Sequence, residues 1–171
     1  MSLGIIIGRF NPLHIGHISL INSSINKCDK TIIILGSANV INENNPFSKD
    51  ERYIILKKEF GDYIYIDHLD DCESDIEWIR SLDELIRKYC NFEDKITFFG
   101  GDLKNDYAIN AVKIFQKELK FKNINFFEKH RDIIPISATK IRNHLQNNEH
   151  EEAKKWLSDN TKHTIIKKYV D

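Results

Sequence analysis

Short runs of apolar, β-branched residues alternate along the chain with segments whose apolar residues recur at helical spacing. Five of these runs predict buried strands, at residues 3–7, 31–35, 63–66, 96–99 and 124–127. Three stripes predict amphipathic helices, namely Ile18, Ile21 and Ile25; Ile79, Leu82, Ile86 and Tyr89; and Ala111, Ile114 and Leu119. The alternation predicts an α/β fold in which right-handed crossovers join a parallel sheet covered by helices on both faces.

The pattern changes at Ser137, after which the chain is helical throughout, with breaks at Asn147-Asn148 and at residues 158–160. The Asn-rich stretch 42–46 is short enough to be a loop, and neither a repeat nor an interdomain linker is evident. We therefore expect a single domain over residues 1–171, with a core at 1–136 and an all-helical C-terminal subregion at 137–171.

Composition narrows the classes of partner. The 171 residues are 41% hydrophobic and 30% charged, which is typical of a soluble globular protein. The formal net charge of −1 gives no electrostatic footprint for nucleic acid or an anionic membrane, so neither is expected as a partner. Affinity for phosphate must then come from a local site.

The cysteines and the apolar runs bear on the compartment. Cys28, Cys72 and Cys90 lie far apart, match no metal-binding spacing and are odd in number, which favours a reducing compartment. No apolar run approaches the length that spans a bilayer. The first run is interrupted by Arg9 and lacks the basic segment of a signal peptide. We expect a cytoplasmic protein.

The segment GRFNPLHIGH, residues 8–17, follows directly on the first predicted strand, where ligands bind in open parallel sheets. A helix that begins near His14 places His14 and His17 on the same side, and Gly16 lets a ligand approach the backbone. Helix N-termini attract anions, and two imidazoles add donors. The segment therefore predicts a polyphosphate site. The alternative is that one histidine caps the helix while the other packs.

The segment ISATKIR, residues 136–142, is a second candidate. Ser137 suits a helix N-cap and leaves the next amides for an anion. Thr139 and Arg142 then share a face, and a guanidinium can bind phosphate oxygens in a fork. An ordinary capped helix with a solvated arginine would show the same pattern.

Together, HIGH and ISATKIR resemble the HxGH and ISxTxxR signatures of the nucleotidyltransferase superfamily. With LGSANVINENNPFSKDER between them, the order resembles the nicotinamide-nucleotide adenylyltransferases of the archaeal type, and Asn11 replaces their usual glutamine. The resemblance covers nearly the whole chain. It implies a Rossmann-like, doubly wound parallel sheet of about five strands in the order 3-2-1-4-5.

The NPFSKDER segment contains an S-x-x-E capping box of Ser48 and Glu51, so a helix is expected to begin there. Arg52 then lies at the end of the first turn. The spacing fits equally a solvated arginine or one that points back to the site, and the resemblance favours a phosphate contact.

The segment FFGGDL ends the fourth predicted strand and resembles the G-x-D-x-L segment of the superfamily. A carboxylate beyond a strand end can accept hydrogen bonds from ribose hydroxyls, so Asp102 is the candidate. A turn aspartate or a helix N-cap is the alternative.

In DCESDIEW, Ser74 and Glu77 predict another capping box, which places Asp75 and Trp78 on one face. The archaeal-type enzymes carry D-x3-N-x2-W here, and this chain reads Asp71, Asp75, Trp78. The indole is expected to stack on the pyridine of the mononucleotide, with a cation–π contribution. The alternative is a tryptophan at the edge of the core.

The departure at Asp75 bears on substrate choice. Relatives have an asparagine there, which can donate as well as accept, whereas a carboxylate can only accept. We expect a preference for the amide, nicotinamide mononucleotide, over the acid, nicotinate mononucleotide. Alternatively, Asp75 only favours its own helix dipole.

The resemblance implies adenylyl transfer from ATP to nicotinamide mononucleotide, which yields NAD and pyrophosphate. The acceptor phosphate is already ionised, so catalysis reduces to alignment and charge stabilisation. The catalytic candidates are His14, His17 and Arg142; the ATP-binding candidates are Gly8, Arg9, Phe10, Asn11, Gly16, Arg52, Gly100, Asp102, Ser137 and Thr139; and the mononucleotide-binding candidates are Asp71, Asp75 and Trp78. No residue is expected to ligate metal, because ATP carries most of the Mg²⁺ coordination.

Other functions share parts of this pattern. One is another transferase of the superfamily that uses pantetheine phosphate, FMN or a CTP-linked alcohol phosphate. A class I aminoacyl-tRNA synthetase also carries HIGH, but this chain is short and has no tRNA-binding basic surface. A third is a nucleotide-sensing module without turnover. The archaeal-type enzymes are commonly multimeric, so a homo-oligomer is a further expected partner.

Overall fold

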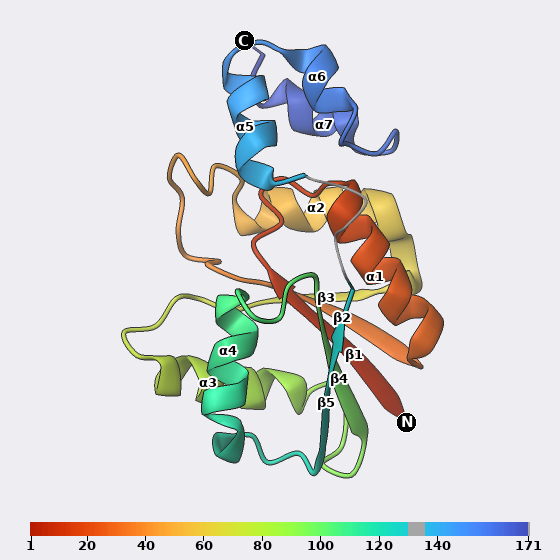
Figure 1. Cartoon of the computed structure of the whole chain (residues 1–171), viewed down its shortest axis with the longest axis vertical. Helices are drawn as coiled ribbons and strands as arrows, with labels where there is room; N and C mark the ends of the chain where they lie inside the picture. The colour runs from red at the N-terminus through yellow and green to blue at the C-terminus, as the bar shows by residue number, and fades with distance from the viewer. Residues whose placement is uncertain (130–135, 171) are drawn as a thin grey trace.

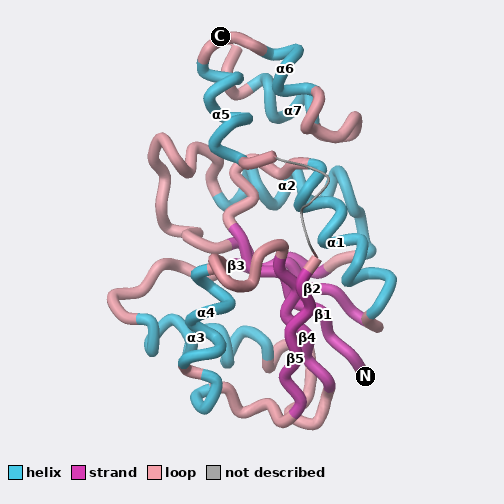
Figure 2. Tube along the Cα trace, viewed as in Figure 1, coloured by secondary structure: helices cyan, strands magenta, loops and turns pink. Residues whose placement is uncertain are grey.

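The computed structural model, which describes residues 1–129 and 136–170, is built on five parallel strands. Their order is β3-β2-β1-β4-β5, as expected (Figures 1 and 2). The strands are β1 (Ser2–Gly8), β2 (Lys30–Leu35), β3 (Tyr65–His68), β4 (Lys95–Gly100) and β5 (Asn123–Glu128). The third strand begins later than predicted because Gly61–Tyr63 forms a 3-10 turn, η1, before it.

Two pairs of helices cover the two faces of the sheet (Figure 1). One face carries α1 (Ile15–Lys27) and α2 (Lys49–Phe60), and the other carries α3 (Asp75–Ile86) and α4 (Tyr107–Ile114). Neighbouring residues of each strand point to opposite faces. Ile6 therefore belongs to the core beneath α1 and α2, whereas Ile5 belongs to the core beneath α3 and α4.

The predicted stripe holds for the first helix, and those of the second and third helices fail in part. α4 ends at Ile114, whose side chain is 73% exposed, and a 3-10 turn, η2 (Gln116–Glu118), follows. Leu119 is buried beyond that turn, so the third stripe mixes two elements. Tyr89 likewise lies past the end of α3.

The C-terminal segment is helical, as predicted, and forms α5 (Ala138–Gln146), α6 (His150–Lys154) and α7 (Lys162–Lys167). Its apolar side chains, Ile141 and Ile165 among them, join the core on the α1 and α2 side. In Figure 1 these helices stand beyond α2 at the end of the molecule that carries the C-terminus. Within the described residues, no helix is long and apolar enough to cross a membrane.

Candidate active site

The two histidines of the HIGH segment are locked to the first turn of α1. His14 is the N-cap, and its Nδ1 accepts hydrogen bonds from the amides of Gly16 and His17, at 3.1 and 3.4 Å. In return, Nδ1 of His17 accepts the amide of His14 at 3.2 Å. The rings stack with centroids 3.6 Å apart. Because each Nδ1 accepts a hydrogen bond, the proton of each neutral ring lies on Nε2.

The glycines around the histidines serve packing. A Cβ on Gly16 would lie 2.9 Å from Cε1 of His14, so the glycine makes room for the capping ring. A Cβ on Gly8 would come within 3.1 Å of Phe10. Phe10 is buried, adopts a positive φ of 49° and meets the ring of His17 edge-on at 4.8 Å. Gly16 and Phe10 thus help to hold the two histidine rings in place.

The ISATKIR segment reaches this same point. Ser137 caps α5 by accepting the amide of Lys140 at 3.2 Å. Nη1 of Arg142 donates to the carbonyl of Asn11 at 2.8 Å, and Nη2 donates to Oγ1 of Thr139 at 3.3 Å. Arg142 is 8% exposed, so the solvated-arginine alternative is wrong. The bond from Arg142 to Asn11 fastens α5 to the segment that carries the two histidines, and we call His14, His17, Thr139 and Arg142 together the histidine–arginine corner.

Asn11 has a different task from the one expected. Its Oδ1 accepts the amide of Phe47 at 2.8 Å, and its Nδ2 donates to the carbonyl of Phe47 at 3.1 Å and to Oδ1 of Asn45. The side chain is buried, and these bonds tie the segment after β1 to the loop before α2. In the structure the amide is thus directed at the chain itself.

Arg52 is bound to main-chain carbonyls in the structure. The capping box of Ser48 forms as predicted, but Arg52 as a whole residue is only 1% exposed. Nη1 donates to the carbonyls of Arg9 and Gly36 at 2.9 and 2.7 Å, and Nη2 donates to that of Ser37 at 3.3 Å. The long side chain begins in the predicted turn but has folded inward, so the solvated-arginine alternative is wrong. Arg52 instead joins the loops after β1 and β2.

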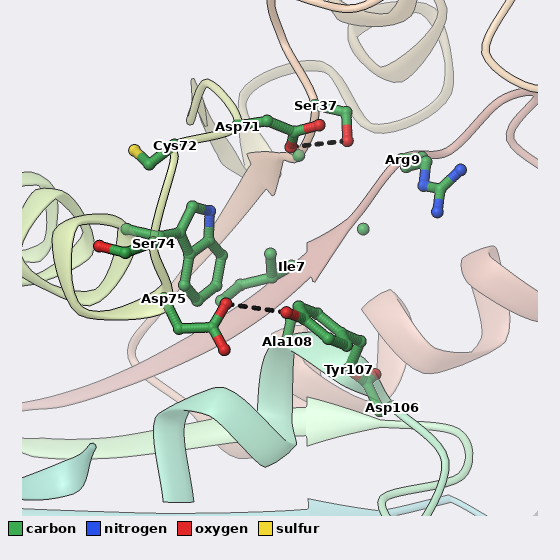
Figure 3. Close-up of a pocket in the computed structure, with 13 residues that line it drawn as sticks. Ile7, Arg9, Ser37, Asp71, Cys72, Ser74, Asp75, Asp106, Tyr107 and Ala108 are labelled. Atoms are coloured by element: carbon green, nitrogen blue, oxygen red, sulfur yellow. Dashed lines mark hydrogen bonds between the residues drawn. The ribbon is translucent and has the colours of Figure 1, made fainter. Parts of the chain in front are cut away.

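A cavity of about 490 Å³ opens beyond the carboxyl ends of β1 and β2, between the first turns of α3 and α4 (Figure 3). We call it the open pocket. It is lined by Ile7, Gly8, Arg9, Gly36, Ser37, Asp71, Cys72, Ser74, Asp75, Trp78, Asp106, Tyr107 and Ala108. It thus brings together all three predicted mononucleotide-binding residues with Gly8 and Arg9.

Hydrogen bonds between side chains cross the open pocket. Asp71 accepts from the hydroxyl of Ser37 at 2.9 Å, and Asp75 accepts from the hydroxyl of Tyr107 at 2.8 Å (Figure 3). Trp78 is half-buried; it packs against the core beneath α3 and also lines the pocket. Both interpretations of Trp78 are therefore compatible with its place.

Comparison with known proteins identifies the family. A sequence model of the cytidylyltransferase-like family matches residues 5–144. The chain belongs to the cytidylyltransferase-like family. It is 26% identical over 155 residues to a protein of Methanococcus aeolicus and 28% identical over 152 residues to one of Sulfurisphaera tokodaii, both named nicotinamide-nucleotide adenylyltransferase. These alignments cover 85% and 83% of this chain and 78% of each relative.

The fold has solved counterparts. A bifunctional NMN adenylyltransferase/ADP ribose pyrophosphatase from Francisella tularensis superposes with a TM-score of 0.78 at 22% identity. It covers 99% of this chain, which spans 50% of the length of that bifunctional chain. The same Francisella enzyme is also known in a complex with AMP and a manganese ion.

In this member of the cytidylyltransferase-like family, three arginines stand near one another at the end of β1. Burial lowers the pKa of Arg52, and the charge of Arg9 lowers it further. Burial likewise lowers the pKa of Arg142; Tyr169 opposes the shift, and Arg9 adds to it. Arg9 itself is exposed and lines the open pocket, so it connects the pocket with the corner. An anion bound among these cations would relieve their repulsion.

The end of β4 and the turn after it hold two further candidates, Gly100 and Asp102. A Cβ on Gly100 would lie 2.6 Å from Leu103, so this glycine permits close packing. Asp102 accepts from Nδ2 of Asn105 at 2.8 Å in an exposed turn, outside the lining of the open pocket. Asp102 therefore has the place that the alternative of a turn aspartate describes. The N-cap of α4 is Asp106, which accepts the amide of Ile109 at 3.0 Å and does line the pocket.

Ser37, Asp106 and Tyr107 are pocket residues that the sequence had not singled out for a role. Ser37 lies two residues past the end of the predicted strand 31–35, and a polar residue beyond a strand end is a signal for a ligand site. Tyr107 gives no such signal, because its place depends on how α4 packs beside α3. Within residues 1–129 and 136–170, no group of three or more His, Cys, Asp or Glu side chains is arranged to hold a metal ion.

Proposed function

We propose that this chain transfers the adenylyl group of ATP to nicotinamide mononucleotide, with NAD and pyrophosphate as products. The observation that carries the proposal is the meeting of a buried, cationic corner and an open pocket at the same end of β1, linked by Arg9. The names of the Methanococcus and Sulfurisphaera relatives support the same reaction.

The corner suits charge stabilisation. A phosphate oxygen of the mononucleotide forms a bond to the α-phosphorus of ATP as the bond to the β-phosphate oxygen breaks, and pyrophosphate leaves. The attacking oxygen is already anionic, so no side chain must remove a proton. We assign the stabilisation of the α-phosphate and the leaving group to the Nε2 donors of His14 and His17 and to Arg142.

The rigidity of the corner favours this assignment. Each imidazole is fixed by backbone amides, and Arg142 is fixed by a carbonyl and a hydroxyl. Donors that are held before the substrate arrives need no reorganisation in the transition state. The first turn of α5, which follows Ser137 and includes Thr139, adds amide dipoles for the ATP phosphates.

The open pocket suits the mononucleotide. Its cavity of about 490 Å³ has an aromatic side, Trp78, and an acidic side, Asp71 and Asp75. We assign stacking on the pyridine to Trp78 and contacts with the polar substituent and the ribose to the two carboxylates. Arg9, at the border with the corner, is placed to attract the phosphate of the mononucleotide.

We propose that the reaction uses Mg²⁺ carried by ATP. Phosphate oxygens are the ligands that Mg²⁺ prefers, and the cationic donors of the corner fit a site that receives the ion already bound to nucleotide. The Francisella enzyme is known in a complex with AMP and a manganese ion, which supports the use of a divalent cation. When bound, the ion would neutralise part of the charge on the leaving pyrophosphate.

The test supplies the purified chain with ATP, Mg²⁺ and one acceptor at a time: nicotinamide mononucleotide, phosphopantetheine, FMN or an alcohol phosphate with CTP. Chromatography should show NAD and an equal amount of pyrophosphate with nicotinamide mononucleotide. Turnover of another acceptor with none of nicotinamide mononucleotide would refute the proposal. ATP binding measured by calorimetry without any product would favour a nucleotide-sensing module.

A further inference from the structure

Tyr107 combines an exposed ring with a fixed hydroxyl. It is the first residue of α4, and the residue is 74% exposed. Its hydroxyl nevertheless donates a hydrogen bond to Asp75, the first residue of α3, at 2.8 Å. Figure 3 shows the two side chains reaching toward one another along one side of the open pocket.

This hydrogen bond joins α3 to α4, two helices that are distant in the sequence and that folding brings together. Asp75 and Tyr107 are 32 residues apart, and both line the open pocket. The hydrogen bond to Asp75 raises the pKa of Tyr107, and the charge of that carboxylate adds to the shift. The phenol therefore remains a donor throughout the pH range in which enzymes are assayed.

We propose that Tyr107 is a specificity-determining residue of the open pocket, which acts with Asp75 to choose between a carboxamide and a carboxylate on the pyridine ring. The inference rests on the proposed function. It assigns a role to a residue that the family resemblance had not indicated.

The selectivity depends on which acceptor receives the single proton of the Tyr107 hydroxyl. A phenol has a single donor, and in the structure it is directed to Asp75. The pair therefore presents a carboxylate oxygen to the ligand, which suits the NH₂ of a carboxamide. A ligand carboxylate would instead face an acceptor of the same charge.

The same donor reverses its effect when the carboxylate of Asp75 is removed. The hydroxyl of Tyr107 can then donate to the carboxylate of nicotinate mononucleotide, which it would stabilise. Tyr107 thus favours the amide when Asp75 is present and the acid when Asp75 is absent. Such a reversal is non-additive, so a double-mutant cycle reveals it.

The experiment compares the wild type, Asp75→Ala, Tyr107→Phe and the double variant, with kcat/KM measured for both mononucleotides. We expect the wild type to prefer the amide at least about tenfold. Tyr107→Phe should lower kcat/KM for the amide about three- to tenfold, because the carboxylate is no longer held. Asp75→Ala should raise kcat/KM for the acid about tenfold, and the double variant should lose that gain.

Two controls separate this role from a general effect. Tyr63→Phe changes another tyrosine, 78% exposed and outside the pocket lining, and should leave both substrates unaffected. The KM for ATP should be unchanged in all five proteins. Unchanged selectivity in Tyr107→Phe, together with a double variant identical to Asp75→Ala, would overturn this inference alone. No turnover of either mononucleotide by the wild type would overturn the proposed function and this inference with it.

Discussion

The histidine–arginine corner and the open pocket lie at the same end of β1 but are built differently. In the corner, His14 and Arg142 are buried, and main-chain amides and a carbonyl hold them. In the open pocket, Asp75 and Tyr107 hold one another through side-chain atoms beside solvent. The corner is therefore fixed before any ligand binds, whereas the pocket is fixed by contacts that a ligand can join.

This difference matches two demands on a transferase. Donors that stabilise a transition state act best when they are rigid, because their orientation then costs nothing at the moment of reaction. Side chains that choose a substrate act through ground-state contacts, which a ligand can complete or disrupt. Substitutions in the corner should therefore change kcat, and substitutions in the open pocket should change KM or selectivity.

The largest expected effect is at His17. His17→Ala should lower kcat about 10²- to 10³-fold, the usual loss for one preorganised donor. Thermal unfolding should change little, because His17 is an N3 residue whose helix retains its N-cap, His14. His163→Ala, at an exposed histidine of α7, is the matched control. A kcat near that of the wild type would remove His17 from the catalytic set.

The next effect concerns Trp78. Trp78→Ala should raise the KM for nicotinamide mononucleotide about tenfold or more, because stacking of a base on an aromatic ring contributes about 1–3 kcal/mol. The KM for ATP should stay nearly constant. Trp78→Phe keeps an aromatic face and should recover most of the affinity. A variant that merely melts at a lower temperature with intact kinetics would assign Trp78 to the core alone.

Arg52 is hydrogen-bonded to the loops of both regions, so we expect its substitution to affect the corner and the open pocket alike. Arg52→Lys keeps the charge but loses the fork, so one nitrogen must replace bonds to the carbonyls of Arg9, Gly36 and Ser37. We expect the free energy of unfolding to fall by about 1–3 kcal/mol and the KM values for both substrates to rise. Arg80→Lys, at an exposed arginine of α3, is the control. An effect on only one substrate would contradict this role.

The smallest expected effect lies where α7 meets α2. Burial alone would raise the pKa of Glu51, but hydrogen bonds from Lys168 and Ser48 outweigh it and hold the pKa below its usual value. This contribution to stability is present above the usual pKa of a glutamate and is lost as the pH falls through the lowered one. Lys168→Met should cost about 0.2–1 kcal/mol of unfolding free energy at neutral pH, as partly exposed pairs do.

The pH dependence checks that assignment. Denaturant unfolding at neutral and at acidic pH should show that the difference between Lys168→Met and the wild type shrinks on acidification. Lys167→Met, at the exposed neighbouring lysine, provides the reference. A difference that stays constant between the two pH values would mean that Lys168 acts through its packing on Phe47 and not through Glu51.

Local patterns predicted most of the fold, because alternation along strands and caps at helix starts are local signals. Ser48, Ser74 and Ser137 all cap helices where the spacing had placed them. Long side chains were predicted less well. Spacing placed Arg52 in the correct turn but could not tell that its guanidinium folds inward to carbonyls of other loops.

The candidate site shows the same limit. His14 and His17 were predictable because both lie in one turn, and Arg142 because Thr139 shares its face. Tyr107 was missed because its bond to Asp75 depends on the packing of α3 beside α4. Contacts between distant segments leave no periodic signal in the sequence, so they are what the structure adds.

The buried guanidinium of Arg52 has a consequence for how the substrates influence each other. It joins the loop after β1, which leads into the corner, to the loop after β2, which lines the open pocket. A ligand that displaces one of these loops must therefore also displace or strain the other, because both are hydrogen-bonded to the guanidinium of Arg52. Thermodynamic linkage then requires reciprocity: ATP changes the affinity for the mononucleotide by the same factor by which the mononucleotide changes the affinity for ATP.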